Sequence, residues 1–552
     1  MLSKFKISKI AKISNKFIRN KTMMSAGEGI TETLLSRDVK NVFGITGSAF
    51  LNASDCFETA GIHLTHFQHE QNAIFACDGF SRVSRKVSAT LNQAGPGSSN
   101  LLTGLATSYW NHSPVVAITP DTDSSSVGKG GFQELNGLDR VFQDQVKYLG
   151  NVKSSDRTLE ILGKGLDRAL TLQGPTQVNI PRDYFNNYEE FEIPKKVVPS
   201  VNPSHPNDIK RVCEMMEKSK NPIILAGAGI NWSDGAYKTL IEFSDKFNIP
   251  VATSYMHNDV FPNHHKLSLG PLGYFGSKSA MKVMSDSDLV IAIGTRCGPF
   301  SLTKQYDIDY WSNDRNLIQV DIDKNKLGLS CQPDISICSD ANMFMKQILY
   351  NFDNKELKFE GSDIVKKNNK IWKQELDELT YNQKPTKDGY IMPKRALKEI
   401  SDFIYQLSYP VLTTDIGNCS SQANSFMKFE SDRSYLCAGL FGSCGYSVPA
   451  AMGAKIAMPD RDVFSLTGDG AFAMQSLGEL LTLNREKIPI TMIVMRNNFW
   501  FAEALNQRLY FGERYNGTQL DGTPSFVGIA KSMDIEGIEV RDYKDINKSL
   551  KK

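Results

Sequence analysis

The chain alternates short runs of β-branched or apolar residues with longer segments of helical periodicity, and this alternation recurs in three successive segments. Such alternation is typical of doubly wound domains, in which helices cover both faces of a parallel sheet. The 552 residues suffice for about three domains of ordinary size. The sequence therefore predicts an α/β fold of three consecutive doubly wound parallel-sheet domains.

Two stretches rich in charge or proline, at about 191–206 and 351–387, separate the segments and are expected to be linkers. We place an N-terminal domain at 25–190, a central domain at 205–350 and a C-terminal domain at 388–552. The expected strands are 41–45, 88–91, 115–119, 177–180, 222–225, 289–293, 317–320, 411–414, 463–466 and 491–494. Asp, Gly or Asn follows each of the last three within three residues, at the carboxyl ends of parallel strands, where open α/β sheets bind their ligands.

Residues 1–24 carry seven Lys or Arg and no acid. Their apolar and basic side chains fall on opposite sides of a helix, which favours a transit peptide and the mitochondrial matrix. The alternative is a disordered basic tail on a cytoplasmic protein. The nine cysteines form no CxxC pair, which indicates a reducing compartment.

Composition excludes two classes of protein. The net charge is +2, so the chain without the seven basic residues of its first segment carries 2 − 7 = −5, and no basic stripe indicates nucleic-acid binding. No apolar stretch reaches the roughly 18 residues that a membrane-spanning helix needs. We expect small-molecule chemistry, with no nucleic acid and no membrane span.

The motif with the most specific chemistry is Gly468-Asp469-Gly470-Ala471, which follows one expected strand, while Asn497-Asn498 follows another 28 residues after Asp469. Mg²⁺ prefers hard oxygen ligands and often ties a phosphate to one or two protein oxygens. Asp469, an Asn amide oxygen and a backbone carbonyl two residues later would supply three. The glycines would let backbone N–H groups approach phosphates at the helix start near Phe472.

This pairing resembles the thiamine-diphosphate-dependent enzymes, whose cofactor motif begins with Gly-Asp-Gly and ends in Asn-Asn. Residues 415–418 and 442–451 are similar to the family's stretches beside the diphosphate and the thiazolium ring. The resemblance implies thiamine diphosphate and Mg²⁺ as cofactors, and pyrimidine-binding, central and diphosphate-binding domains. The residues implied at the diphosphate side are Asp415, Gly417, Asn418, Ser443, Cys444, Gly468, Asp469, Gly470, Ala471 and Asn497.

Two of these assignments depend on the family alone. Cys444 would be the apolar wedge that bends the bound cofactor, with a small buried residue at a helix start as the alternative. When this chain is aligned with the family's motif through Trp500, the resemblance implies that the metal ligands are Asp469, Asn497 and the carbonyl of Phe499.

Glu70 is the expected catalytic residue. A buried carboxylate at this helix start can hydrogen-bond the aminopyrimidine and stabilise its imino form, which removes the thiazolium C2 proton. Burial raises the pKa of such a carboxyl group, which suits proton sharing at neutral pH. The stretches 44–48 and 94–100 stand around it in the family's order, and they imply cofactor contacts at Gly95 and Asn100.

Within the family the chain is most similar to the sulfoacetaldehyde acetyltransferases, on the passages 47–50, 109–114, 130–134 and 179–184. This resemblance implies a reaction in which sulfoacetaldehyde and phosphate give acetyl phosphate and sulfite. Both substrates are anions, so the site needs cationic or N–H donors. The candidate substrate residues are His112, Lys129 and Gln133; each could equally be a solvated loop residue.

Two further readings stay open. An acetolactate synthase-like carboligase would share every cofactor residue but take pyruvate, and a catalytically silent homologue would bind only cofactor or a partner. The match fades after Asp521, where the strand and helix that should finish the third sheet are not evident, so we expect a shortened C-terminal domain. The family implies a homodimer or homotetramer with each site shared between subunits. No residues in the central segment demand FAD.

Overall fold

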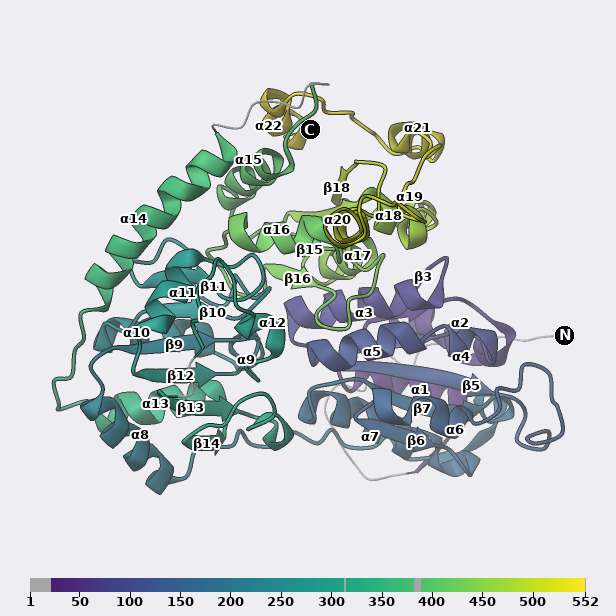
Figure 1. Cartoon of the computed structure of the whole chain (residues 1–552). Helices are drawn as coiled ribbons and strands as arrows, with labels where there is room; N and C mark the ends of the chain where they lie inside the picture. The colour runs from purple at the N-terminus through teal and green to yellow at the C-terminus, as the bar shows by residue number, and fades with distance from the viewer. Residues whose placement is uncertain (1–20, 312–313, 382–388, 552) are drawn as a thin grey trace, which may run out of the picture.

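The computed structural model describes residues 21–311, 314–381 and 389–551. Three α/β domains form the corners of a triangle, with the C-terminal domain lying above the other two in the view of Figure 1. Each domain has a sheet of parallel strands flanked by helices, which confirms the predicted fold class. In the described part of the chain, no helix is long and apolar enough to cross a membrane.

The N-terminal domain has a six-stranded sheet in the order β3-β2-β4-β5-β7-β6. Its strands are β2 (Asn41–Gly44), β3 (His63–His66), β4 (Ser88–Leu91), β5 (Val115–Asp121), β6 (Tyr148–Asn151) and β7 (Thr176–Pro181). The helices that cover it are α1 (Ala26–Leu35), α2 (Leu51–Ala60), α3 (Glu70–Ser84), α4 (Pro96–Ser99), α5 (Leu102–Asn111), α6 (Leu138–Val141) and α7 (Thr158–Thr171). Every residue of β4 and β7 is buried, as expected for strands covered on both faces.

A two-stranded antiparallel ribbon closes this domain. β1 (Thr22–Ser25) pairs with β8 (Tyr188–Phe191) in register from Thr22↔Phe191 to Ser25↔Tyr188. The expected transit peptide therefore overlaps the domain at residues 22–24, and residues 1–20 lie outside the described part of the chain. A targeting role for the first segment stays a prediction.

The central domain has the sheet order β11-β10-β9-β12-β13-β14. Its strands are β9 (Pro222–Ala226), β10 (Val251–Thr253), β11 (Ser268–Pro271), β12 (Leu289–Ile293), β13 (Asn316–Asp321) and β14 (Ile335–Cys338). Its helices are α8 (Pro206–Lys218), α9 (Gly229–Trp232), α10 (Ala236–Phe247), α11 (Lys278–Ser285), α12 (Pro299–Leu302) and α13 (Ala341–Asn351). The chain order reverses between β9 and β12, and this topological switch point opens a crevice at the carboxyl ends of the strands.

The second expected linker contains one long helix, α14 (Gly361–Thr380), which runs along the central domain toward the C-terminal domain (Figure 1). The C-terminal sheet has the order β16-β15-β17-β18, from β15 (Val411–Thr414), β16 (Tyr435–Cys437), β17 (Val463–Gly468) and β18 (Thr491–Met495). Its helices are α15 (Pro393–Tyr405), α16 (Asn418–Phe426), α17 (Ser447–Ala457), α18 (Asp469–Ala471), α19 (Glu479–Glu486), α20 (Phe501–Tyr510), α21 (Phe526–Ser532) and α22 (Ile546–Leu550). Among the described residues β18 pairs only with β17, so this sheet ends there.

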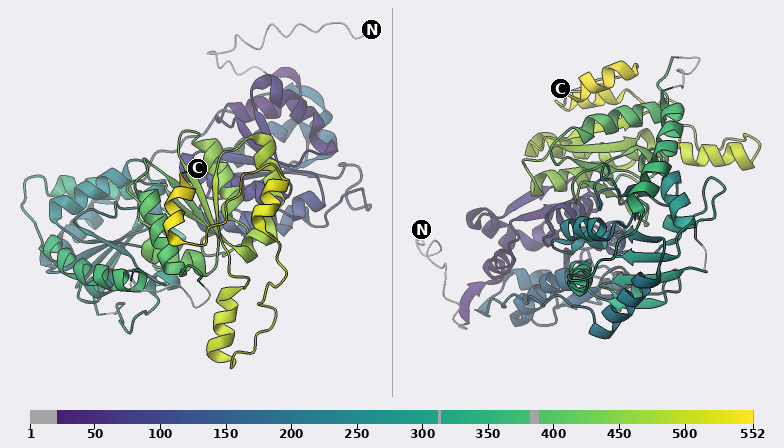
Figure 2. Two further views of the ribbon diagram at one scale, coloured as in Figure 1. Left: turned by 90° about the horizontal axis from the view of Figure 1, so that it is seen from above. Right: turned by 90° about the vertical axis from the view of Figure 1, so that its left-hand side faces the viewer.

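Helix α20 and the loop after it project away from the three domains, as both views in Figure 2 show. Large apolar side chains on this projection are exposed: Phe501, Leu509, Tyr510, Phe511 and Tyr515. Apolar side chains gathered on one surface are typical of a protein–protein contact.

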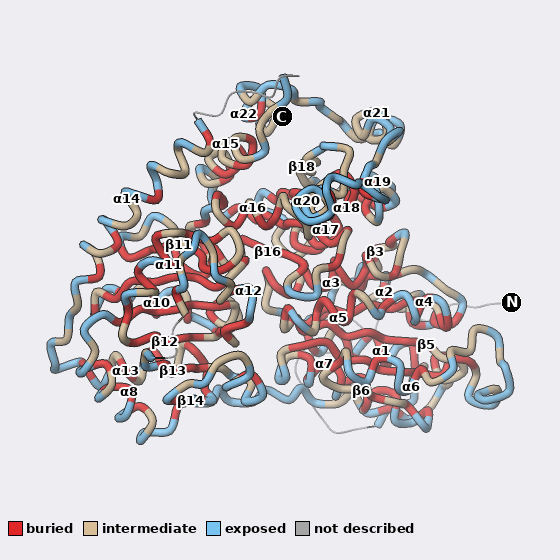
Figure 3. Tube along the Cα trace, in the orientation of Figure 1, coloured by how far each residue is buried: buried red, intermediate tan, exposed pale blue. Residues whose placement is uncertain are grey.

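The N-terminal and C-terminal domains pack directly through α3 and α17, whose facing sides are buried (Figure 3). Two glycines bring the helices together. A Cβ on Gly79 would lie 2.1 Å from the carbonyl oxygen of Ala450, and one on Gly453 would lie 1.9 Å from that of Ala76. No side chain larger than hydrogen fits at either position.

Candidate cofactor site

Asp469 begins α18 directly after β17, and only 2% of its surface is exposed. Its Oδ2 accepts the backbone N–H groups of Asn497 at 3.0 Å and of Asn498 at 2.6 Å, while its Oδ1 accepts that of Gly470 at 3.0 Å. The structure thus joins the Gly-Asp-Gly turn to the Asn-Asn turn at the ends of adjacent strands, as the sequence predicts.

The second turn is shaped by its own side chains. The Asn497 amide oxygen accepts the N–H of Phe499 at 2.9 Å, and Asn498 takes a left-handed conformation with φ of 58°. A Cβ on Gly470 would meet the Trp500 ring at 3.1 Å, so this glycine lets the two turns approach. Asp469, the Asn497 amide and the Phe499 carbonyl are oxygen donors of the kind that Mg²⁺ prefers.

The helix that begins at Asp469 contains a π-helical turn at Phe472–Ser476 before it continues as α19. A π turn is the usual way in which an α-helix accommodates one additional residue, and such turns are frequent at functional sites.

The carboxyl ends of β15 and β17 carry open backbone beside a buried amide nitrogen. A Cβ on Gly417 or on Gly468 would meet nothing within 4 Å. The buried Nδ2 of Asn418 has no hydrogen-bond partner among the described residues. Because buried polar groups are normally paired, this donor is available to a ligand. Open glycine backbone and an N–H donor fit a diphosphate.

Asp415, for which a cofactor contact stays a prediction, makes several hydrogen bonds within its own domain. Its fully buried carboxylate accepts the N–H of Gly445 at 2.9 Å and the N–H and hydroxyl of Ser447 at 3.3 and 3.2 Å. Burial raises the pKa of Asp415 to about 6, against the opposing effect of these hydrogen bonds. Asp415 therefore holds the 442–447 loop at the end of β15.

That loop carries Ser443 and Cys444. The Ser443 hydroxyl lies 2.5 Å from that of Thr107 on α5, so it contacts the N-terminal domain of the same chain. The half-buried Cys444 lies two residues after Gly442, whose φ is 74°. Burial raises the pKa of the Cys444 thiol to about 11, so it stays protonated and apolar at neutral pH, as a wedge requires.

Glu70 begins α3 and is 9% exposed. Its Oε2 accepts the side-chain N–H of Asn100 at 2.9 Å, and a Cβ on Gly97 would lie 3.2 Å from its Oε1. Gly95, two residues before Gly97, has a φ of 63°. The structure therefore assembles the predicted Glu70, Gly95 and Asn100 at one place.

Gln133 joins this cluster through a residue that the sequence analysis did not select. The Gln93 amide donates to the Gln133 amide oxygen at 2.7 Å, and a Cβ on Gly95 would lie 2.6 Å from the Gln133 carbonyl oxygen. The available signal for Gln93 was its place immediately before the 94–100 stretch. Gln133 thus contacts Gln93 and Gly95, next to the stretch that carries Asn100, and its role as a substrate contact stays a prediction.

Lys129 and His112 lie elsewhere. Lys129 is exposed on the 122–137 loop, and its ammonium group donates to the Ser125 carbonyl at 2.7 Å. His112, at the end of α5, lines a cavity of about 560 Å³ to which all three domains contribute residues. Neither is brought to Glu70 within one chain.

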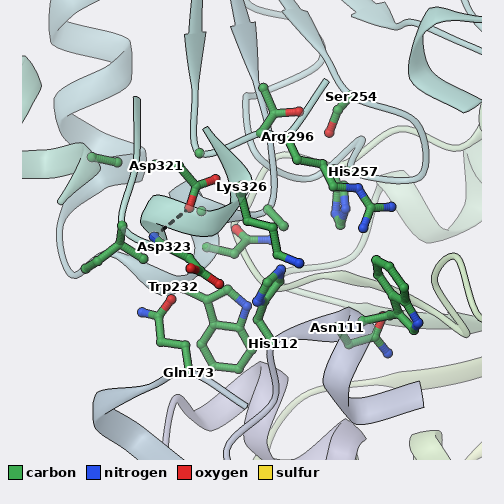
Figure 4. A pocket seen from close by; sticks show the side chains of 18 of the residues that line it. Asn111, His112, Gln173, Trp232, Ser254, His257, Arg296, Asp321, Asp323 and Lys326 are labelled. Atoms are coloured by element: carbon green, nitrogen blue, oxygen red, sulfur yellow. Dashed lines mark hydrogen bonds between the residues drawn. The ribbon is translucent and has the colours of Figure 1, made fainter. Parts of the chain in front are cut away.

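Figure 4 shows this interdomain cavity at the switch point of the central sheet, where His112, Arg296 and Lys326 point inward and Asp321 and Asp323 stand beside them. Burial and the nearby Lys147, Lys326 and Arg296 lower the pKa of His112 to about 4. His112 is therefore neutral at pH 7 and could serve an anion only as an N–H donor.

The two halves of the expected cofactor site face different directions within one chain. The contacts of the Glu70 carboxylate described above are to Asn100 and Gly97 of its own domain. Successive helical residues are about 100° apart, so Glu70 stands about 200° around α3 from Asn72, which donates to the C-terminal domain. Glu70 therefore points away from the C-terminal domain of its own chain.

Comparison with known families agrees with this geometry. Three family models match: "Thiamine pyrophosphate enzyme, N-terminal TPP binding domain" at residues 24–140, "central domain" at 209–348 and "C-terminal TPP binding domain" at 415–552. The chain belongs to the family of thiamine-diphosphate-dependent enzymes, and thiamine diphosphate is its cofactor.

Individual relatives span nearly the whole chain. A "Sulfoacetaldehyde acetyltransferase" of Alcaligenes xylosoxydans xylosoxydans is 38% identical over 98% of this chain and 92% of its own length. A protein of the same name from Castellaniella defragrans is 37% identical, over 96% and 90%. A "Probable acetolactate synthase large subunit" of Methanocaldococcus jannaschii is 32% identical, over 96% and 89%. The chain is thus similar to enzymes of both names.

Proposed function

We propose that this enzyme is an acetyltransferase that converts sulfoacetaldehyde and phosphate to acetyl phosphate and sulfite. The observation that carries the proposal is the identity of 34–38% to four proteins named sulfoacetaldehyde acetyltransferase, against 29–32% to three proteins named acetolactate synthase large subunit or probable acetolactate synthase large subunit. The contacts of Gln133 with Gln93 and Gly95, next to the stretch that carries Asn100, support it, because an amide N–H suits an anionic sulfonate or phosphate.

Mg²⁺ would be held by the carboxylate of Asp469, the amide oxygen of Asn497 and the carbonyl of Phe499. Asn418 and the open backbone at Gly417 and Gly468 would receive the diphosphate. The Asp469 carboxylate accepts three backbone N–H groups, which hold the two turns against each other. Mg²⁺ would bind at its remaining lone pairs.

When bound, thiamine diphosphate supplies a carbanion that adds to a carbonyl and then acts as an electron sink. Glu70 would hold a proton between its carboxylate and the pyrimidine ring nitrogen, and Asn100 orients that carboxylate through the 2.9 Å hydrogen bond. Asp415 keeps the Cys444 loop in place, and Cys444 would force the cofactor into its bent form. Gln133 would orient the anionic substrate.

The active unit is proposed to be a homodimer or a homotetramer, in which Glu70 of one subunit meets Asp469 of another. Glu70 points away from the C-terminal domain of its own chain, so a second chain is needed to complete the site. The exposed apolar side chains of the α20 projection provide a surface for such a contact. Sedimentation with activity assays tests this, since an active monomer contradicts it.

Product analysis tests the reaction. The full chain, with thiamine diphosphate, Mg²⁺, sulfoacetaldehyde and phosphate, is expected to release sulfite and acetyl phosphate in equal amounts. Glu70→Gln should abolish both products. Pyruvate consumption without sulfite release would assign the chain to the carboligases, and no turnover of either substrate would assign it to the silent homologues.

A further inference from the structure

Glu479 is a fully buried carboxylate at the contact between the N-terminal and C-terminal domains. It begins α19, on the helix that starts at Asp469. Its Oε1 accepts the side-chain N–H of Asn72 at 2.8 Å, and its Oε2 accepts the hydroxyl of Thr482 at 2.8 Å. The backbone N–H of Gln68 reaches both oxygens, at 3.2 and 3.3 Å.

The N-terminal domain groups that donate to Glu479 lie on either side of Glu70. Gln68 is two residues before Glu70, just ahead of α3. Asn72 is two residues after Glu70, in the first turn of α3. The first turn of a helix leaves backbone N–H groups without intrahelical partners, so acceptors outside the helix determine where it begins. A carboxylate near this end also interacts favourably with the positive end of the helix dipole.

A second contact links the start of α3 to the helix that leads into α19. The Asn72 amide also donates to the Gln475 carbonyl at 3.0 Å, on the π-helical turn before α19. The helix that carries Asp469 at its start is thus attached, ten residues later, to the turn that carries Glu70. Removing the Glu479 carboxylate would leave Gln68 and Asn72 without this acceptor in a buried interface.

We propose that Glu479 is a positioning residue for Glu70: its carboxylate holds the first turn of α3, and proton transfer at Glu70 depends on this hold. The inference rests on the catalytic role of Glu70 in the proposed function. Displacing a catalytic group by about 1 Å can cost roughly a hundredfold in rate, so a loosened turn should be visible in the proton-transfer step.

Glu486 provides a matched control. It lies at the end of the same helix and also contacts the N-terminal domain, where its Oε2 lies 2.9 Å from the His63 Nε2. His63 begins β3 and is remote in sequence from the first turn of α3. A general weakening of the domain contact would affect both variants, whereas loss of positioning would affect only Glu479.

The experiment measures how fast the C2 proton of enzyme-bound thiamine diphosphate exchanges with deuterium, by quenched flow and NMR, in the full chain with Mg²⁺. Glu479→Met keeps the length of the side chain and removes both acceptor oxygens. We expect C2 exchange to slow about tenfold or more, with the Kd for thiamine diphosphate unchanged and faster amide exchange over residues 68–75. Glu486→Met should exchange at the wild-type rate.

Glu479→Gln retains one acceptor oxygen for Asn72 and is expected to restore most of the C2 exchange rate. Should Glu479→Met not fold, Asn72→Ala removes the hydrogen bonds of Asn72 to Glu479 at 2.8 Å and to the Gln475 carbonyl at 3.0 Å, and it should slow C2 exchange in the same direction.

The inference is overturned if Glu479→Met folds and exchanges the C2 proton at the wild-type rate, while Glu70→Gln abolishes exchange. If Glu479→Met does not fold, a wild-type exchange rate in Asn72→Ala overturns it in the same way. Wild-type exchange in Glu70→Gln instead overturns the proposed role of Glu70, and the positioning role with it.

Discussion

The carboxylate of Asp469 accepts the backbone N–H of Asn497 at 3.0 Å, which joins two turns that are 28 residues apart in sequence. The same carboxylate accepts the N–H groups of Asn498 and Gly470, so it fixes the Gly-Asp-Gly and Asn-Asn turns against each other.

Asp469→Ala should remove the increase in melting temperature that thiamine diphosphate and Mg²⁺ give the wild type, because only a ligand bound to the native state stabilises it. The variant should also be less stable without ligands by about 1–3 kcal/mol, since N–H groups lose their acceptor. Differential scanning fluorimetry with and without both ligands measures this. Asp460→Ala, at an exposed turn, is the control, and an undiminished ligand shift in Asp469→Ala would refute the metal role.

Asp415→Asn should change how stability depends on pH. The pKa of Asp415 is raised to about 6 in the folded protein from an ordinary value of 3.8, so between these values the folded state keeps a proton that the unfolded state releases. This stabilisation is complete below about pH 4 and is lost as pH rises through about 6, an effect of about 3 kcal/mol. Urea unfolding of the apo protein from pH 4 to 7 should show a steeper decline for the wild type than for the variant. Parallel curves would contradict the assignment.

Gly453→Ala should destabilise the contact between α3 and α17, because its Cβ would lie 1.9 Å from the Ala76 carbonyl oxygen and neither backbone can move freely. Overpacking of this kind costs about 1–3 kcal/mol, which thermal unfolding would detect as a lower melting temperature. Gly528→Ala, in α21, is the matched control, since its nearest contact is an ordinary 3.5 Å. Equal melting temperatures for the two variants would show that the contact tolerates a methyl group.

The His112 imidazole should stay neutral across the physiological range, since its pKa is lowered to about 4. A histidine with a lowered pKa contributes stability that is present above the unfolded value of about 6.5 and is lost as pH falls through the folded value. NMR titration, with His112→Gln to assign the signal, should show no protonation between about pH 5.5 and 8. A midpoint near 6.5 would mean that the cavity is wetter and less cationic than the structure shows.

The strands that sequence patterns located best are those buried on both faces. The predictions 88–91, 289–293 and 411–414 coincide with β4, β12 and β15, because covered parallel strands are short continuous apolar runs. β3, with the sequence HLTH, and the three-residue β10 and β16 were missed. Short or polar strands are held by their neighbours in the sheet, and a local pattern does not record those neighbours.

The sequence by itself determined the fold class, the family and the turn chemistry at Asp469 and Asn497, because strand ends and glycine turns are local and their spacing is fixed by the chain. Only the tertiary structure decided that Gln133 contacts Gln93 and Gly95, that His112 lines a cavity away from Glu70, and that Glu479 reaches the first turn of α3. Those relationships join residues from separate elements or domains. Their physical cause is the packing of one buried surface on another, and sequence periodicity shows that a residue is buried but not against what.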